Sequence, residues 1–223
     1  MANPWLDIDV ADYVGHMHSP GVNQGPILNG LLREALQDLR AGRVLVVGCS
    51  TGNGLEHVDP AITRSVTALD INPVFLSQVA DRFSDRGFQL DVRCGDLARA
   101  TFEPEAFDLI HAALIFEYVD WTNVLPRLVS SLSARGTFSV VLQQPSPTTP
   151  AVTPSPYARL QSLESVFRFV APDMLIAHAT ELGLTLAARR IVPLPGAKAF
   201  EVLRFRRNDC SAALQETFPD VIE

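Results

Sequence analysis

A glycine-rich segment that follows a predicted strand is the first place where the sequence could bind a ligand. The apolar run RVLVV at 43–47 leads directly into GCSTGNG at 48–54, and a helix is predicted to start at 55–58. Glycine permits positive φ and lets a ligand approach the backbone, while a helix N-terminus offers free N–H groups and a partial positive charge. The pattern predicts a ligand-binding loop, and the alternative is an ordinary strand-to-helix turn.

The residues of this loop exclude two common kinds of ligand. A phosphate-binding loop of the G-x-x-x-x-G-K-S/T type needs a lysine, and the only lysine of the chain is Lys198. The dinucleotide fingerprint G-x-G-x-x-G would need its third glycine where the chain has His57. A nucleoside without a pyrophosphate remains as the ligand that the loop favours.

Two aspartates follow the ends of the next two predicted strands. Asp70 ends the strand at 65–70, where its carboxylate could accept hydrogen bonds from both hydroxyls of a ribose. The alternative for this residue is a cap on the helix that follows. Asp96 follows the strand at 88–93, and together with the N–H of Leu97 it could bind the amine and ring nitrogen of adenine.

These groups require a scaffold that brings strand ends to one edge of a sheet. Apolar runs rich in β-branched residues predict strands at 43–48, 65–70, 88–93, 107–114 and 136–143. Apolar residues at three- and four-residue spacing predict helices at 27–39, 73–83 and 121–132. This alternation predicts a parallel sheet with helices on both faces.

The second half of the chain departs from the alternation. Residues 145–156 are rich in proline, serine and threonine, which predicts a loop or short lid. Helical patterns follow at about 157–168 and 173–182, and two β-rich runs at 184–194 and 197–207 flank a Pro-Gly turn. These two runs predict an antiparallel hairpin.

At these residues the chain resembles the class I S-adenosylmethionine-dependent methyltransferases, over roughly residues 25–206. VLVVGCSTGNG resembles the family's glycine motif, TALDINP its ribose-acid motif, RCGDL its adenine motif and FDLIHAAL its fourth strand. The resemblance implies an α/β, Rossmann-like doubly wound fold with a seven-stranded, mostly parallel sheet and a C-terminal antiparallel hairpin. It also implies S-adenosylmethionine as the cofactor.

The family's motifs carry over to a set of cofactor-binding residues, with two departures. The residues that the resemblance implies are Gly48, Cys49, Ser50, Gly52, Asp70, Ile71, Asp96, Leu97 and Ala112. Val46 stands where the family usually has an acidic residue. In the family, that acid helps to hold the loop and, through water, the cofactor's amino group. Ser50 stands where a glycine is usual.

The resemblance also divides the chain into parts. We expect residues 1–24 to form an N-terminal cap or arm and residues 25–207 to form the methyltransferase domain. Within that domain, 145–183 would be a loop and helical insertion before the last hairpin. Residues 208–223 would be a C-terminal tail.

The reaction that the resemblance implies is an in-line attack of a nucleophile on a sulfonium methyl, for which the enzyme mainly supplies alignment and a desolvated pocket. No metal ion is required. Tyr13, His16 and His18 are candidates for a cap over the methyl, with His16 or His18 as a proton acceptor; the alternative is a poorly ordered arm. Glu117 could orient an acceptor, although a glutamate before a helix more often complements the helix's positive end.

Composition and missing motifs favour a small-molecule acceptor. Eighteen basic against 25 acidic residues give a net charge of −7, which repels a polyanion such as nucleic acid. The residues HAAL at 111–114 stand where base-amine methyltransferases usually carry an Asn/Asp-Pro-Pro-aromatic motif. The rival functions are a nicotinamide-dependent oxidoreductase on a related fold and a non-catalytic, cofactor-binding partner subunit.

The sequence also favours a cytoplasmic protein without a membrane segment. No basic residue precedes Arg33, and the longest uncharged stretch, 136–158, contains five prolines. The three cysteines, Cys49, Cys94 and Cys210, lie far apart and indicate neither a disulfide framework nor a zinc site.

Overall fold

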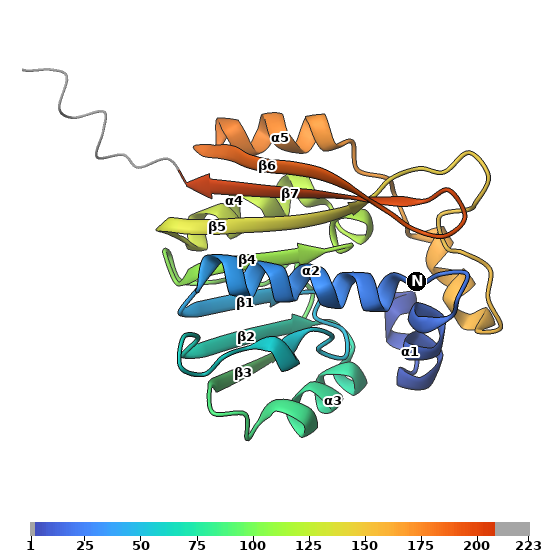
Figure 1. The fold of residues 1–223 in the computed structure, drawn as a ribbon, viewed down its shortest axis with the longest axis horizontal. Helices are drawn as coiled ribbons and strands as arrows, with labels where there is room; N and C mark the ends of the chain where they lie inside the picture. The colour runs from blue at the N-terminus through green and yellow to red at the C-terminus, as the bar shows by residue number, and fades with distance from the viewer. Residues whose placement is uncertain (1–2, 208–223) are drawn as a thin grey trace, which may run out of the picture.

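A seven-stranded sheet forms the centre of the computed structural model, which describes residues 3–207. The strands are β1 (Arg43–Val47), β2 (Ser65–Asp70), β3 (Gln89–Cys94), β4 (Phe107–Ala113), β5 (Leu132–Gln143), β6 (Leu184–Pro193) and β7 (Ala199–Arg207). They lie in the order β3-β2-β1-β4-β5-β7-β6 (Figure 1). All neighbours pair in parallel except that β7 is antiparallel to both β5 and β6, so the expected fold class is confirmed.

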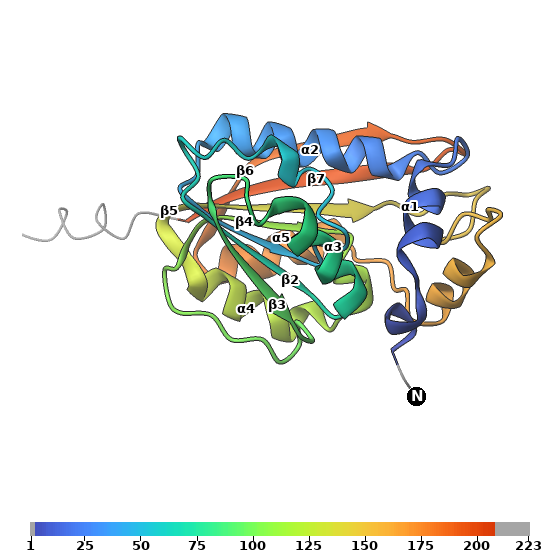
Figure 2. The ribbon, with the colours of Figure 1, turned by 90° about the horizontal axis from the view of Figure 1, so that it is seen from below.

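Helices cover both faces of this sheet, as the alternation predicts (Figure 2). The helices of the first face are α2 (Gln24–Leu39) and α3 (Pro73–Phe83), and those of the second are α4 (Trp121–Ser131) and α5 (Pro172–Glu181). Leu32 and Ala35 of α2 and Val79 of α3 share one apolar cluster, whereas Leu125 of α4 and Leu175 of α5 belong to another. Each helix therefore buries one apolar stripe against the sheet.

The segment after the glycine loop differs from the prediction. Instead of the α-helix expected from 55, the chain makes one 3₁₀ turn, η2 (Leu55–His57), and returns to an extended conformation at Val58. Pro60 follows, and the residue before a proline is disfavoured in helical geometry. The structure of residues 3–207 therefore has no α-helix that begins directly after this loop.

Two further boundaries differ from the sequence prediction. β5 begins at Leu132, directly after α4, so Gly136 lies inside the strand rather than before it. The expected helix at 157–168 is a 3₁₀ helix, η4 (Ala158–Ser165). Its buried residues Leu160 and Leu163 are three positions apart, which matches the three-residue repeat of a 3₁₀ helix.

The N-terminal arm lies across the carboxyl ends of the strands. It comprises η1 (Pro4–Asp7) and α1 (Val10–His18), which lie beside η4 at the same end of the molecule (Figures 1 and 2). Ile8 belongs to an apolar cluster with Phe75 and Leu160. The side-chain amide of Asn72 donates hydrogen bonds of 2.9 Å to the carbonyls of Trp5 and Ile8. The alternative of a poorly ordered arm is not what the structure shows.

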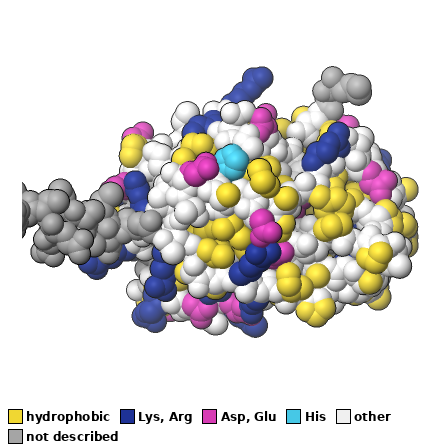
Figure 3. All heavy atoms as spheres, turned by 90° about the horizontal axis from the view of Figure 1, so that it is seen from above, with side chains coloured by type: hydrophobic (Ala, Val, Ile, Leu, Met, Phe, Trp, Pro, Cys, Tyr) yellow, Lys and Arg dark blue, Asp and Glu magenta, His cyan; other side chains and the backbone are white. Residues whose placement is uncertain are grey.

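The outer strand β6 is protected by charge. Its Arg189 and Arg190 pair with acids on β7 and α2, and charged side chains lie among hydrophobic ones on the face viewed in Figure 3. Charges on an edge strand disfavour pairing with another sheet.

No helix among residues 3–207 is long and apolar enough to cross a bilayer. Within the same residues, His, Cys, Asp and Glu form no group of three or more that could hold a metal ion. Cys49 and Cys94 are free, and Cys210 and the predicted 208–223 tail lie outside the described residues.

Candidate functional site

A pocket lies at the carboxyl ends of β1, β2 and β4, and residues of α1 also line it. It contains about 1070 Å³ of space between atoms, part of it continuous with solvent. The strand order reverses direction between β1 and β4, and open α/β sheets bind ligands in the crevice at such a switch point. The fold thus brings the glycine loop, the two aspartates and the arm to a single cavity.

The glycine loop turns sharply where it meets this pocket. Gly48 has φ of 66°, and a Cβ there would come within 3.0 Å of the Ile115 side chain. Ser50 adopts φ of 49°, the left-handed region that favours glycine. This conformation explains why the family usually has glycine at the position of Ser50. Both Gly48 and Ser50 line the pocket.

Three of the implied cofactor residues lie behind the pocket wall instead of on it. Gly52, with φ of 78°, faces α3, where a Cβ would lie 2.8 Å from Phe83. Cys49 is buried in the cluster beneath α2 and α3, and Ala112 is buried inside β4, while its neighbour Ala113 reaches the pocket. Packing accounts for their small side chains, and their contact with the cofactor stays a prediction.

Asp70 lines the pocket and organises the loop beside it. Its Oδ2 accepts from the N–H of Ser50 at 2.8 Å and its Oδ1 from the N–H of Asn72 at 2.9 Å. The helix cap of α3 is Asn72, whose Oδ1 accepts from Val74 and Phe75, so the capping alternative for Asp70 is wrong. Burial raises the pKa of Asp70, although backbone hydrogen bonds oppose this shift. Each carboxylate oxygen retains a lone pair for a ligand.

The third predicted cofactor segment also lines the pocket. Ile71, Asp96 and Leu97 all face it. The Asp96 carboxylate accepts from the N–H of Ala98 at 2.9 Å, and the guanidinium of Arg127 donates to the Leu97 carbonyl at 3.3 Å. These contacts fix the loop that carries Asp96 next to the end of β2.

A polar network holds the glycine loop from below, where Val46 replaces the family's acid. Asn29 of α2 donates to Asn53 at 3.0 Å and to Glu56 at 2.6 Å, and its amide oxygen lies 2.7 Å from Nε2 of His57. Val46 itself is buried among apolar side chains. Hydrogen bonds from Asn29 therefore attach the 53–57 end of the loop to α2.

Tyr13 and His16 reach the pocket from α1. The Tyr13 hydroxyl interacts with the Ser50 side chain, and burial raises the pKa of Tyr13 to about 12. His16 is 5% exposed, with Nδ1 2.8 Å from Oγ of Ser155. Burial, with a contribution from Lys198, lowers the pKa of His16 to about 4, so the ring is neutral near neutral pH. His18 is exposed and lies outside the pocket lining.

Glu117 lies behind the pocket wall. It is 1% exposed and outside the pocket lining, whereas its neighbour Tyr118 lines the pocket. Its Oε1 accepts from the backbone N–H of Gln143 at 2.7 Å, and its Oε2 has no hydrogen-bond partner in the described part of the chain. Burial raises the pKa of Glu117 to about 7.

Several pocket residues carried no signal in the sequence. Trp5, Gln24 and Tyr118 line the cavity, and Gln24 donates to the side chain of Gln143 at 3.0 Å. Trp5 and Tyr118 pack edge to face with ring centres 5.0 Å apart. These residues belong to separate segments, so only the folded chain brings them together.

Comparison with known proteins agrees with this arrangement. Residues 44–136 match the family described as a methyltransferase domain. No curated protein gives a significant sequence match.

Solved structures share the fold across most of the chain at low identity. The N-methyltransferase NodS from Bradyrhizobium japonicum WM9, in complex with S-adenosyl-L-homocysteine, is 18% identical with a TM-score of 0.65, covering 92% of this chain and 99% of its own. Geranyl diphosphate C-methyltransferase from Streptomyces coelicolor A3(2), also with S-adenosyl-L-homocysteine, is 11% identical with a TM-score of 0.63, covering 80% and 77%. The cyclase SpnF is 16% identical with a TM-score of 0.62, covering 81% and 80%, so the fold alone does not dictate the reaction. The match to a methyltransferase domain thus covers residues 44–136, and the solved structures show that the chain shares their fold.

Proposed function

We propose that this chain transfers the methyl group of S-adenosylmethionine to a small-molecule acceptor by in-line displacement. The observation that carries the proposal is the alignment of Gly48, Asp70 and Asp96 along one side of a pocket that the N-terminal arm covers. This alignment gives a nucleoside three recognition points at the ends of β1, β2 and β3. The remaining pocket volume, beneath α1, would receive the acceptor.

The cofactor fits the groups present on that side. Asp70 would accept from the ribose hydroxyls, while Asp96 and the Leu97 N–H would bind the adenine edge. Gly48 and Ser50 would line the cofactor, since both face the pocket, and a Cβ at Gly48 would meet Ile115 at 3.0 Å. When bound, S-adenosylmethionine supplies an electrophilic methyl on a sulfonium, and the residues of the chain orient it and exclude water.

The enclosing arm favours a small acceptor over a polymer. Trp5, Tyr13 and His16 of residues 1–24 form one wall of the pocket, and Val152 and Leu160 of the 145–183 insertion form another. A site enclosed from both sides admits a small molecule more readily than a folded protein or a duplex. The net charge of −7 and the free thiols of Cys49 and Cys94 fit a cytoplasmic enzyme.

Calorimetric titration with S-adenosylhomocysteine and, separately, with NADH tests the cofactor assignment. We expect S-adenosylhomocysteine to bind and NADH not to bind. The reverse result would favour a nicotinamide-dependent oxidoreductase and contradict the proposal. Transfer of labelled methyl from the cofactor to a metabolite extract then tests catalysis. Binding without transfer to any fraction would indicate a non-catalytic partner subunit.

A further inference from the structure

The residues that line the pocket are of two chemical kinds. The part formed by the glycine loop and the ends of β2 and β3 carries Asp70 and Asp96. The rest, which we term the acceptor chamber, is walled mainly by aromatic and aliphatic side chains from the arm, η3 (Phe116–Tyr118) and the 145–183 insertion. Its principal walls are Trp5, Tyr13, Tyr118, Leu160, Leu163 and Phe167.

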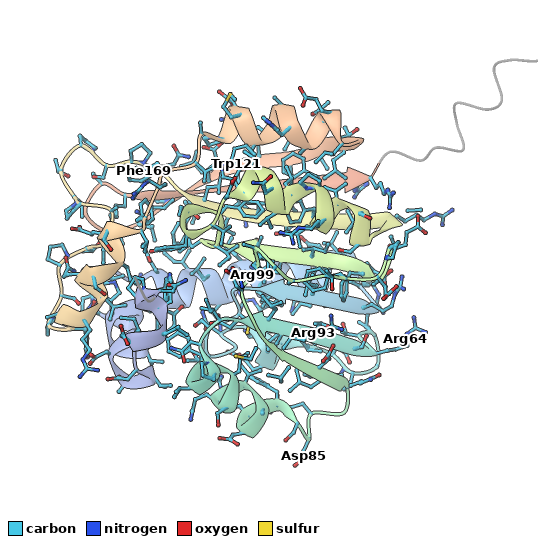
Figure 4. All side chains as sticks on the ribbon, turned by 180° about the vertical axis from the view of Figure 1, so that it is seen from behind. Arg64, Asp85, Arg93, Arg99, Trp121 and Phe169 are labelled. Atoms are coloured by element: carbon cyan, nitrogen blue, oxygen red, sulfur yellow. The ribbon has the colours of Figure 1, made fainter. Side chains whose placement is uncertain are left out.

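The acceptor chamber offers no counter-charge to an anion. Among residues 3–207, the charged side chains that line the whole pocket are Asp70 and Asp96, and no lysine or arginine lines it. Lys198 lies behind the wall, where its Nζ donates to the Ala151 carbonyl at 2.7 Å and to Thr153 Oγ1 at 2.8 Å. Arg64 lies at the opposite end of the sheet from α1 (Figure 4). Lys198 is close enough to lower the pKa of His16, but its hydrogen bonds hold it to the chain, so an anionic acceptor would lose its hydration without direct contact to a cation.

Most polar groups around the chamber already have partners within the protein. Gln24 donates to Gln143, and Gln143 in turn donates to the Ala151 carbonyl at 2.9 Å. Ser155 occupies Nδ1 of His16, which leaves Nε2 as the ring nitrogen available to a ligand. The chamber thus needs a ligand with much apolar surface and few polar groups.

A buried donor also lacks an acceptor beside this chamber. The indole Nε1 of Trp5 is buried and makes no hydrogen bond with residues 3–207, while the ring packs edge to face against Tyr118. Buried donors are normally paired, so an orphan on a pocket wall indicates that the protein's own polar atoms do not complete the site. An oxygen on a bound molecule would provide the missing acceptor after a small shift of the indole.

We infer that the acceptor is an uncharged, mainly apolar ring compound with a phenol-type hydroxyl, which hydrogen-bonds to Nε2 of His16. The inference rests on the proposed methyl transfer. The aromatic walls favour a flat ring through edge-to-face and offset contacts. Because His16 is neutral near neutral pH, its Nε2 can accept the hydroxyl proton in a hydrogen bond when Nδ1 carries the ring hydrogen.

The proposed step balances without a further reagent. The acceptor oxygen forms a bond to the methyl carbon as the carbon–sulfur bond breaks, and the electron pair of that bond remains on sulfur. The oxygen still bears its proton when it gains the methyl. The O–H group of this methylated, positively charged oxygen is strongly acidic. The proton passes to Nε2 of His16 and then to solvent, so a weakly basic imidazole suffices.

A binding comparison on the protein saturated with S-adenosylhomocysteine tests the acceptor class. The probes are a naphthol and a hydroxynaphthoate, which share a bicyclic ring and a hydroxyl and differ by one carboxylate. We expect the naphthol to bind at least about tenfold more tightly, as measured by calorimetry. Equal or tighter binding of the hydroxynaphthoate, or no binding of either probe, would overturn the acceptor class while leaving cofactor binding intact. Failure of S-adenosylhomocysteine itself to bind would instead overturn the proposed function.

His16→Gln tests the hydrogen bond, with His18→Gln as the matched control on the same helix. His18 is exposed and outside the pocket lining. We expect His16→Gln to weaken naphthol binding about tenfold or more and to leave S-adenosylhomocysteine binding within about twofold, whereas His18→Gln changes neither. Unchanged naphthol affinity in a folded His16→Gln protein would overturn the role of His16.

Discussion

Asp70 illustrates how one side chain can serve both the loop and a ligand. Its two oxygens already accept from Ser50 and Asn72, and the carboxylate still faces the pocket. A negative acceptor suits the paired hydroxyls of a ribose better than a neutral amide, because hydrogen bonds to charged groups are stronger.

We therefore expect Asp70→Asn to weaken S-adenosylhomocysteine binding by about 1.5–3 kcal/mol, which is roughly 10- to 150-fold. Isothermal titration measures this change. The matched control is Asp91→Asn on β3, whose carboxylate pairs with Arg93 outside the pocket lining and should leave affinity unchanged. Wild-type affinity in Asp70→Asn would remove Asp70 from the binding site.

The buried carboxyl of Glu117 should make the free energy of unfolding depend on pH. Because burial raises its pKa to about 7 in the folded protein, the unfolded chain binds fewer protons between about pH 4.5 and 7. The free energy of unfolding should therefore fall as pH rises through this window, by an amount of about 3 kcal/mol. Glu117→Gln removes the titration and should gain that amount relative to wild type between about pH 5 and 8.

Urea denaturation of wild type and Glu117→Gln, each at about pH 5 and about pH 8, measures the difference in free energy of unfolding between the two proteins. Other titrating groups, including the buried His16 and His111, are common to the two proteins and cancel. A stability difference that does not vary with pH would show that Glu117 is ionised in the folded protein over this range.

At the scale of elements, the glycine loop combines ligand contact with packing against α3. Gly52 belongs to the packing part, since a Cβ would lie 2.8 Å from Phe83 and the φ of 78° disfavours other residues. We expect Gly52→Ala to lower the free energy of unfolding by about 1–3 kcal/mol through strain and crowding.

Thermal unfolding of Gly52→Ala and Gly95→Ala checks this assignment. A Cβ at Gly95 meets no atom within 4 Å, so its substitution should change stability by less than about 0.5 kcal/mol. Equal stability of the two variants would contradict the packing role of Gly52.

The 145–156 segment depends on distant residues for its position. Lys198, at the β6–β7 turn, donates to Ala151 and Thr153, and Gln143 donates to Ala151 as well. We expect Lys198→Met to speed hydrogen exchange in this segment while leaving exchange in the central strands unchanged, because the lost bonds are local.

Arg135→Met, which removes an exposed cation from β5, is the control for a general effect of charge. Hydrogen-exchange mass spectrometry compares both variants with wild type. Identical exchange over 145–156 in Lys198→Met and wild type would show that the other contacts alone hold the segment.

The N-terminal arm contributes to the stability of the whole molecule and also lines the pocket. Ile8 packs against Phe75, and the Asn72 amide donates to the carbonyls of Trp5 and Ile8. Deleting residues 1–20 should therefore abolish transfer and also lower the free energy of unfolding by at least about 2 kcal/mol, since apolar surface and two amide hydrogen bonds are exposed.

Calorimetric unfolding and a methyl-transfer assay check the two effects. Val14→Ala, an exposed position on α1, is the control and should change neither. Full transfer by the truncated chain would show that the acceptor does not depend on the arm.

Local patterns in the sequence determined the sheet and the side of the pocket that carries Asp70 and Asp96. Apolar runs and their spacing locate β1 to β7 within a few residues, because burial of a strand or helix face imposes a short repeat on neighbouring residues. Asp70 and Asp96 could be placed together because the carboxyl ends of adjacent parallel strands meet at one edge.

Only the tertiary structure decided the side chains that meet across long sequence separations. The pairing of His16 with Ser155, the burial of Glu117 beneath Gln143 and the contact of Gly52 with Phe83 join segments with no shared local repeat. Such contacts depend on how the arm and the 145–183 insertion pack over the sheet. Their free energy comes from the combined burial of many residues, so no single stretch of sequence encodes them.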